Sequence, residues 1–270
     1  MSSAILDEHS SETRGVRELQ AIFLHSYTWR MLAFVDIRSR YRRTTLGPFW
    51  ITMTTAVMAL SIGLLYGQFF GQAIAGYLPY FIVGYVSWML IASVISESTT
   101  ALVVATTLIK ASDMPLAFHV MRMVQRNFIV FFHNVILIVL LWFILQWKLD
   151  WYALTFFPAL AMLYVFLSAA ALIVSIVCVR YRDVPPMVGA FMQLLFFATP
   201  IFWLPESLRI GRFLLTMNPF YHFIIILRDP LLGRPFGWEN WAIAAGMTIV
   251  TVVLACWIYI RYRNRVAYWV

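Results

Sequence analysis

Long apolar stretches without a charged residue divide the chain and predict its helices. These windows cover residues 44–96, 127–147, 151–179, 184–205 and 240–260. One helix needs about 20 apolar residues to cross a bilayer, so the first window, which is 53 residues long, holds two crossings separated near residues 71–76. The pattern therefore predicts an all-α polytopic membrane protein with six transmembrane helices.

The segment ahead of the first window has an amphipathic pattern. One helical stripe carries its apolar and aromatic residues: Val16, Leu19, Phe23, Tyr27, Met31, Phe34 and Tyr41. Glu18, His25 and Asp36 fall on the opposite face. This pattern predicts an interfacial helix that lies along the inner membrane surface. Trp29 and Leu32 interrupt the polar face, and a helix packed on the protein's own cytoplasmic loops stays as the alternative.

Composition and charge support the membrane assignment and orient the chain. Of its 270 residues, 62% are hydrophobic and 12% are charged, whereas soluble domains have about 25% charged residues. With both termini cytoplasmic, 15 of the 20 Lys and Arg residues lie inside, as the positive-inside rule requires. The net charge of +8 is thus expected to contact lipid headgroups and not nucleic acid. We expect a cytoplasmic N-terminus (residues 1–43), a membrane domain (44–260) and a cytoplasmic C-terminus (261–270).

The sequence lacks the residues that nucleotide, metal or proton chemistry would require. Neither of the two lysines, Lys110 and Lys148, stands in a Gly-Lys-Ser/Thr loop, so the chain is not expected to be a P-loop ATPase. We find no catalytic constellation and no metal-ligand spacing. The predicted spans contain no ionisable residue except His133, which disfavours a self-powered carrier. Energy for transport is then expected from a partner; a secondary carrier or an enzyme acting on polyprenyl lipids stays as an alternative.

Two loops are long enough to have structure of their own. In the cytoplasmic loop 97–126, we expect a helix as far as residue 109, a break at 113–116 and then further helix. The outer loop 206–239 carries Pro219 and four arginines: Arg209, Arg212, Arg228 and Arg234. We expect these arginines to contact headgroups, with attraction of an anionic glycan as the alternative.

Four short motifs resemble those of ABC-2 type permeases that export bacterial polysaccharides. The first is Arg-Tyr-Arg-Arg at 40–43 followed by Leu-Gly-Pro-Phe-Trp at 46–50. The others are Arg-Tyr-Arg-Asp-Val at 180–184, Pro-Ile at 200–201 and Asn-Pro at 218–219. The resemblance extends over nearly the whole chain from about residue 16, and it implies two short re-entrant helices in the outer loop before the last span, near residues 208–217 and 219–227.

The resemblance also implies roles for particular residues. A coupling region that docks on an ATPase would contain Lys110, Asp113, Met114, Pro115, Arg182 and Asp183. A pore entrance would contain Arg40, Arg42, Arg43, Gly47, Pro48 and Trp50. Because sugar rings stack on aromatic faces, candidate pore-lining aromatics are Tyr66, Phe69, Tyr85, Trp88, Phe196 and Phe197; packing against lipid or other helices is the alternative for each.

By resemblance, the expected function is export of a polysaccharide on an undecaprenyl diphosphate carrier, with O-antigen as the first candidate and capsule or teichoic acid as alternatives. The chain would act as a homodimer in the bacterial inner membrane. Two copies of a separate ABC ATPase would bind ATP and Mg²⁺, and the chain itself would carry no cofactor.

Overall fold

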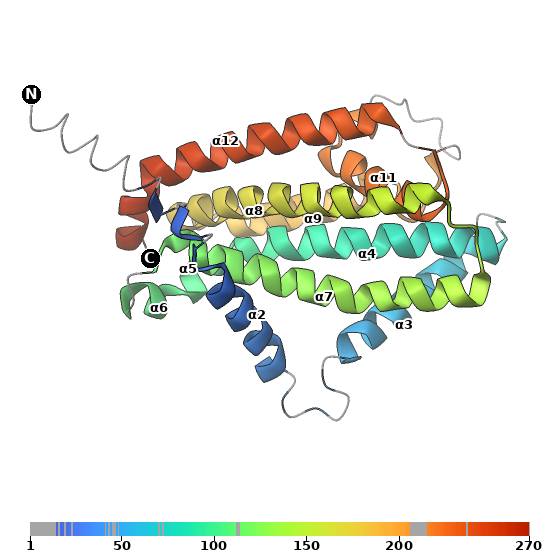
Figure 1. The fold of residues 1–270 in the computed structure, drawn as a ribbon, viewed down its shortest axis with the longest axis horizontal. Coiled ribbons are helices and arrows are strands. Elements are labelled where there is room, and N and C mark those ends of the chain that lie inside the picture. The colour runs from blue at the N-terminus through green and yellow to red at the C-terminus, as the bar shows by residue number, and fades with distance from the viewer. Residues whose placement is uncertain are drawn as a thin grey trace, which may run out of the picture.

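A computed structural model describes residues 15–269, except positions 16, 19, 23, 41, 43, 45, 46, 48, 70, 72, 112, 113, 206–214 and 236. The described part of the chain is a bundle of helices that run roughly along one axis (Figure 1). Its elements are α2 (Ser26–Arg40), α3 (Phe49–Phe69), α4 (Ile74–Ser98), α5 (Ala101–Val104), α6 (Thr106–Ala111), α7 (Leu116–Leu145), the 3₁₀ helix η1 (Trp151–Thr155), α8 (Phe156–Arg180), α9 (Val184–Ala198), α11 (Pro219–Leu231) and α12 (Trp238–Trp269).

Five helical segments in the described residues are long and apolar enough to cross a membrane. They are Phe49–Phe69, Ile74–Ser98, Leu116–Leu145, Trp151–Arg180 and Trp238–Val266. At 1.5 Å per residue, the shortest of them is about 31 Å long, the thickness of a hydrocarbon core. The window at 184–205, predicted as a further crossing, contains α9, which is apolar but only 15 residues long. The six-span count stays a prediction.

The two ends of the bundle carry different helices and connections. One end carries α5, α6 and the last turns of α12, at the left of Figure 1, and we call it the α6 end. The turn between α8 and α9, residues 181–183, lies at the same end. The opposite end carries the connections at residues 146–150 and 232–235.

Helix α4 forms the centre of the bundle. It packs against α3, α7, α8, α9 and α11, and 83% of its most apolar window is buried, against 28% for α3 and 22% for α12. A helix that is apolar around its whole circumference suits such a central position.

Helix α3 contacts α4 and α7 through small residues. Its buried residues are Thr52, Thr55, Ala59, Gly63 and Gly67, spaced three or four apart. Small residues on one stripe let two membrane helices approach closely. The large side chains of α3 lie on its other faces, and many of them are exposed, including Met53, Val57 and Leu65.

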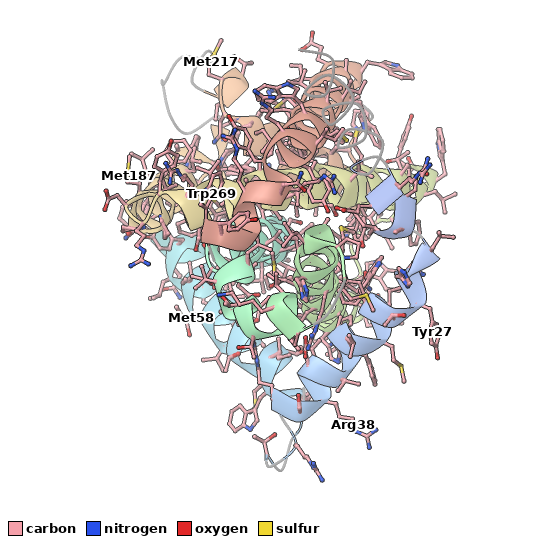
Figure 2. The ribbon with its side chains drawn as sticks, turned by 90° about the vertical axis from the view of Figure 1, so that its left-hand side faces the viewer. Tyr27, Arg38, Met58, Met187, Met217 and Trp269 are labelled. Carbon is pink, nitrogen blue, oxygen red and sulfur yellow. The ribbon has the colours of Figure 1, made fainter. Side chains whose placement is uncertain are left out.

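Helix α2 buries the face that the sequence pattern assigned as polar. Trp29, Ala33 and Ile37 are buried, and α2 packs along α7. The predicted apolar stripe is exposed at Tyr27 (77%), Met31 and Phe34. Figure 2 shows Tyr27 on the outer side of α2. One face of α2 therefore packs on the protein, and its apolar stripe is exposed at Tyr27, Met31 and Phe34; the interfacial position of this helix stays a prediction. Val16, Leu19, Phe23 and Tyr41 lie outside the described residues.

The long loop at 97–126 is largely helical. It contains α5, α6 and the first 11 residues of α7, with the expected break before Leu116. Pro115 is the N-cap residue of α7, where a proline loses no helical hydrogen bond. Helix α7 therefore starts well before the charge-free window at residue 127.

Helix α11 lies among the long helices (Figure 1). Its second residue, Phe220, packs edge-on against Trp88 of α4 with ring centres 5.8 Å apart. The carbonyl of its last residue, Leu231, accepts a 2.9 Å hydrogen bond from Trp147 at the opposite end of the bundle. The helix thus runs from the interior of the bundle to that end. Of the other predicted short helix, only residues 215–217 are described.

Candidate functional site

The connection from α2 to α3 carries the residues predicted at a pore entrance. Arg40 ends α2, and its side chain is exposed, as is that of Arg42. Gly47 adopts a φ of 57°, in the left-handed region that glycine enters without strain. Its carbonyl accepts a 3.3 Å hydrogen bond from the N–H of Trp50, which is 41% exposed. Two further predicted entrance residues lie outside the described part of the chain: Arg43 and Pro48.

A polar pocket of about 220 Å³ lies beside Arg40, among α3, α4 and α7. Its polar lining consists of Arg40, Thr54, Thr55, Ser93, Glu97, Arg126, Asn127 and Asn134. Asn134 is buried, and its Oδ1 has no hydrogen-bond partner among the described residues. A pocket with this lining can accept hydroxyl or phosphate oxygens.

Four charged side chains form a network along this pocket. Arg122 of α7 makes two hydrogen bonds to the carboxylate of Asp36 on α2, at 2.8 and 2.5 Å. Arg126, one turn further along α7, donates to Oε2 of Glu97 on α4 at 2.5 Å, and it also lies 3.7 Å from Asp36. Asn127 donates to the same Glu97 oxygen at 2.9 Å. The network joins α2, α4 and α7 and is neutral.

Arg40 adds a positive charge to this neutral network. Its side chain forms no ion pair within the described ranges. The entrance pocket therefore has one uncompensated guanidinium at its rim, which favours an anionic ligand group.

The residues predicted to couple to a partner lie at the α6 end. Lys110 is exposed in the last turn of α6, and Met114 and Pro115 are half-buried before α7. Arg182 and Asp183 are exposed on the turn between α8 and α9, and neither forms an ion pair with another described residue. Asp113 lies outside the described residues. The predicted pairing of Arg182 and Asp183 with other elements of the chain is thus not seen in the described part.

Phe202 joins three of the candidate pore-lining aromatics. Its ring centre lies 5.3 Å from that of Tyr66 on α3, 5.6 Å from Phe196 and 5.9 Å from Phe197 on α9. Tyr66 and Phe197 are exposed, and Phe69, 6.4 Å from Tyr66, is 80% exposed. Phe202 was not among the predicted aromatics. It directly follows the Pro-Ile motif at 200–201, and this position is the sequence signal that could have indicated it.

The other two candidate aromatics lie in the core. Tyr85 stacks on Phe81 within α4, with ring centres 5.5 Å apart. Trp88 contacts Phe196 and Phe220. Tyr85 and Trp88 are 8% and 4% exposed, so in this conformation they pack against other helices, which was the stated alternative.

The segment after α9 is held by the Asn-Pro motif and by tyrosines that the sequence analysis did not single out. Asn218 Nδ2 donates to Oγ1 of Thr199, the residue before the Pro-Ile motif, at 2.7 Å. The hydroxyl of Tyr77 donates to the carbonyl of Phe202. The hydroxyl of Tyr80 lies 3.0 Å from the carbonyl oxygen of Pro200. These contacts fix the segment against α4 and α11.

Arg228 of α11 also contacts the segment after α9. It has no exposed surface, and its Nη1 donates to the carbonyl oxygen of Pro200 at 2.7 Å. Arg228 therefore serves neither role expected for the outer arginines in this conformation, because neither a headgroup nor a glycan reaches it. Of the other three, Arg209 and Arg212 lie outside the described residues, and Arg234 is exposed.

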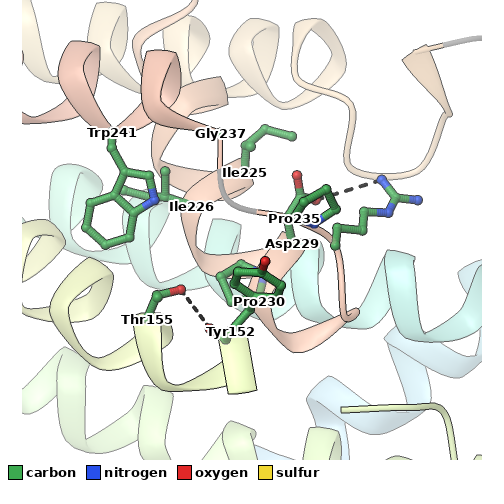
Figure 3. A pocket seen from close by; sticks show the side chains of 10 residues that line it. Tyr152, Thr155, Ile225, Ile226, Asp229, Pro230, Pro235, Gly237 and Trp241 are labelled. Atoms are coloured by element: carbon green, nitrogen blue, oxygen red, sulfur yellow. Dashed lines mark hydrogen bonds and ion pairs between the residues drawn. The ribbon is translucent and has the colours of Figure 1, made fainter. Parts of the chain in front are cut away.

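A second pocket lies at the opposite end of the bundle, between η1, α11 and the start of α12 (Figure 3). Arg234 lies 3.8 Å from Asp229 on its rim, and Thr155 donates to the carbonyl of Tyr152 at 2.8 Å. Its volume of about 10 Å³ is no more than a water molecule needs. This pocket is therefore not a candidate for cargo.

Comparison with known proteins identifies the family. Residues 27–232 match the model of the ABC-2 type transporter family. The chain belongs to that family. It is also similar to the O-antigen export system permease protein RfbA of Klebsiella pneumoniae, with 22% identity over 237 residues that cover 84% of this chain and 90% of the relative.

The matched region of this ABC-2 permease contains every feature of the site. It begins in α2, includes the entrance pocket and the exposed residues of the α6 end, and closes directly after α11. Helix α12 follows it. As an ABC-2 family member with five helices long enough to cross a membrane, the chain is a multi-pass membrane subunit of a transporter.

Proposed function

We propose that the chain is the membrane-spanning subunit of an ATP-driven exporter of undecaprenyl-diphosphate-linked polysaccharide, with O-antigen as its first candidate cargo. The observation that carries the proposal is the family match over residues 27–232, together with a relative named for O-antigen export that aligns over 90% of its own length. Capsule and teichoic-acid polymers are the alternative cargoes.

The proposed exporter is a homodimer in the bacterial inner membrane. Helices α3 and α9 would line the path between the two copies, since both expose large apolar side chains and have few buried residues. Helix α9 and the segment after it would form the remaining crossing, and the chain would return through α11 as a re-entrant element. The distribution of Lys and Arg supports cytoplasmic termini, with the α6 end in the cytoplasm.

The entrance pocket would receive the charged end of the cargo. A diphosphate group carries negative charge and several acceptor oxygens, and Arg40 offers an uncompensated guanidinium beside a polar pocket of about 220 Å³. The exposed rings of Tyr66, Phe69 and Phe197 would then stack against sugar rings further along the path.

Energy would come from a separate ABC ATPase bound at the α6 end. Lys110, Arg182 and Asp183 are exposed there without ion pairs in the described ranges. Such free charges of both signs suit a complementary protein surface. Two ATPase copies are expected, one for each permease.

Copurification tests the proposal. The tagged chain is extracted from native membranes in a mild detergent, and the bound proteins are identified and counted. We expect a nucleotide-binding subunit in a one-to-one ratio and ATP hydrolysis by the purified complex. Recovery of the chain alone from membranes in which the ATPase is expressed would contradict the proposal.

A further inference from the structure

A groove of about 760 Å³ opens on the side of the bundle bordered by α2. Its walls come from α7 and α12, and its floor comes from α8. Figure 2 places Tyr27 of α2 and Met187 of α9 on opposite sides of the molecule, so the groove lies away from the proposed translocation path. Its lining on α8 extends from Phe157 to Leu172, which is about 22 Å of helix.

The groove is apolar along most of its length and has one polar stretch near its middle. Phe132, Leu160, Ala161 and Val165 belong to the apolar part. The polar stretch contains Ser26, Arg30, Gln125, Tyr164 and Ser168, and apolar residues, including Ala117, Met121 and Leu172, line the groove beyond it, towards the α6 end. Tyr164 donates to Gln125 there at 3.3 Å.

Arg30 gives this polar stretch a positive charge. Its side chain is exposed, its guanidinium carbon lies 5.2 Å from the centre of the Trp29 ring, and it forms no ion pair within the described ranges. The described residues that line the groove include no Asp or Glu. A ligand that complements the groove therefore has one anionic group and an apolar remainder.

We propose that this groove binds an anionic phospholipid as a resident ligand, with its phosphate at Arg30 and an acyl chain between α7 and α12. Guanidinium groups form paired hydrogen bonds to phosphate oxygens. The apolar walls face the bilayer, which supplies such lipids from the side. This site is distinct from the proposed cargo path, so a resident lipid would support α2 and not be transported.

Native mass spectrometry of the complex purified from membranes tests this site. The complex is equilibrated with equal amounts of phosphatidylglycerol and phosphatidylcholine, and the lipids retained by the permease are counted. We expect preferential retention of phosphatidylglycerol. Arg30→Glu should lower its retention at least fivefold, and Ala161→Trp, which fills the groove without changing charge, should lower it to a similar degree.

Two matched variants serve as controls. Arg38→Glu makes the same charge change on an exposed arginine of α2 that does not line the groove, and Ala242→Trp adds the same bulk at an exposed position of α12. Both should retain phosphatidylglycerol like the unchanged protein. Equal retention in all variants, or an equal loss in Arg38→Glu, would overturn the proposal. Preferential binding of a polyprenyl phosphate in competition with phosphatidylglycerol would assign the groove to cargo and overturn it also.

Discussion

Arg228 donates a 2.7 Å hydrogen bond from Nη1 to the carbonyl oxygen of Pro200, and its guanidinium carbon lies 3.8 Å from the centre of the Tyr80 ring. One buried cation thus joins the end of the α9 segment, the central helix α4 and α11. Its Nε and Nη2 have no hydrogen-bond partner among the described residues, so the contacts with Pro200 and Tyr80 account for its stabilisation there.

A double-mutant cycle between Arg228 and Tyr80 tests this contact. Cation–π pairs that are removed from water contribute about 2 kcal/mol, so we expect Arg228→Met and Tyr80→Leu to be coupled by about 1–2 kcal/mol in the free energy of unfolding. Denaturant unfolding of the purified permease provides the measurement. Additive effects of the two substitutions would show that the stacking contributes nothing.

The ion pair between Asp36 and Arg122 is expected to hold α2 against α7. Asp36→Arg should destabilise the protein by about 1–3 kcal/mol, because it removes charged hydrogen bonds and faces two arginines. Adding Arg122→Asp should restore only part of this loss, since Arg126 also lies 3.7 Å from Asp36. Thermal unfolding measures both effects, with Arg38→Asp as the control on an exposed arginine. If Arg38→Asp destabilised the protein as much as Asp36→Arg, the effect would not depend on the specific ion pair between Asp36 and Arg122.

Gly63 is expected to be required for the approach of α3 to α4. A Cβ atom at this position would lie 2.6 Å from Leu78 Cδ1 and 3.3 Å from Phe81 Cδ1. Gly63→Leu should therefore destabilise the protein by about 1–3 kcal/mol, and Leu78→Ala should relieve part of the cost. At Gly246 on α12, an added Cβ atom would meet no neighbouring atom within 4 Å beyond its own helix backbone. Gly246→Leu should therefore leave the melting temperature unchanged or raise it. Equal effects at both glycines would contradict the close contact.

Charge reversal at the α6 end is expected to weaken binding of the ATPase. Lys110→Glu and Asp183→Arg should each reduce ATPase copurification several-fold, because charges in an interface set its complementarity. Pro115→Gly should act in the same direction by loosening the start of α7. Membrane insertion should not change in any of the three variants, and the melting temperature should not change in the two charge reversals. Undiminished copurification with all three variants would rule out this end as the docking surface.

Charge-free windows predicted most of the long helices because charges are costly in the bilayer. Two helices, α7 and α9, begin or end at other residues than their charge-free windows. Helix α7 starts 11 residues before its window, directly after the N-cap residue Pro115, and the arginines of this extension, Arg122 and Arg126, pair with Asp36 and Glu97. Helix α9 ends at Ala198, well before its window closes, because the next residues turn towards α4 and α11 and Pro200 disfavours helix before it.

Only part of the candidate site could be predicted from the sequence, because several of its contacts join residues that are far apart in the chain. Exposed basic residues at helix ends, such as Arg40 and Lys110, stand out in the sequence. The burial of Arg228 depends on Pro200 and Tyr80, which are distant in sequence, and no local pattern predicts that they meet. The two faces of α2 were ambiguous because Asp36 looks like a solvent-facing residue until Arg122 is placed beside it.

The location of lipid-linked glycan in a deletion strain tests the central claim most directly. The gene is deleted in the native host, and polymer is measured on the cell surface and on undecaprenyl diphosphate at the inner face. We expect a bare surface and accumulated lipid-linked polymer inside, whose sugars identify the cargo as O-antigen, capsule or teichoic acid. Normal surface glycan in a host with no second exporter would contradict polysaccharide export by this permease.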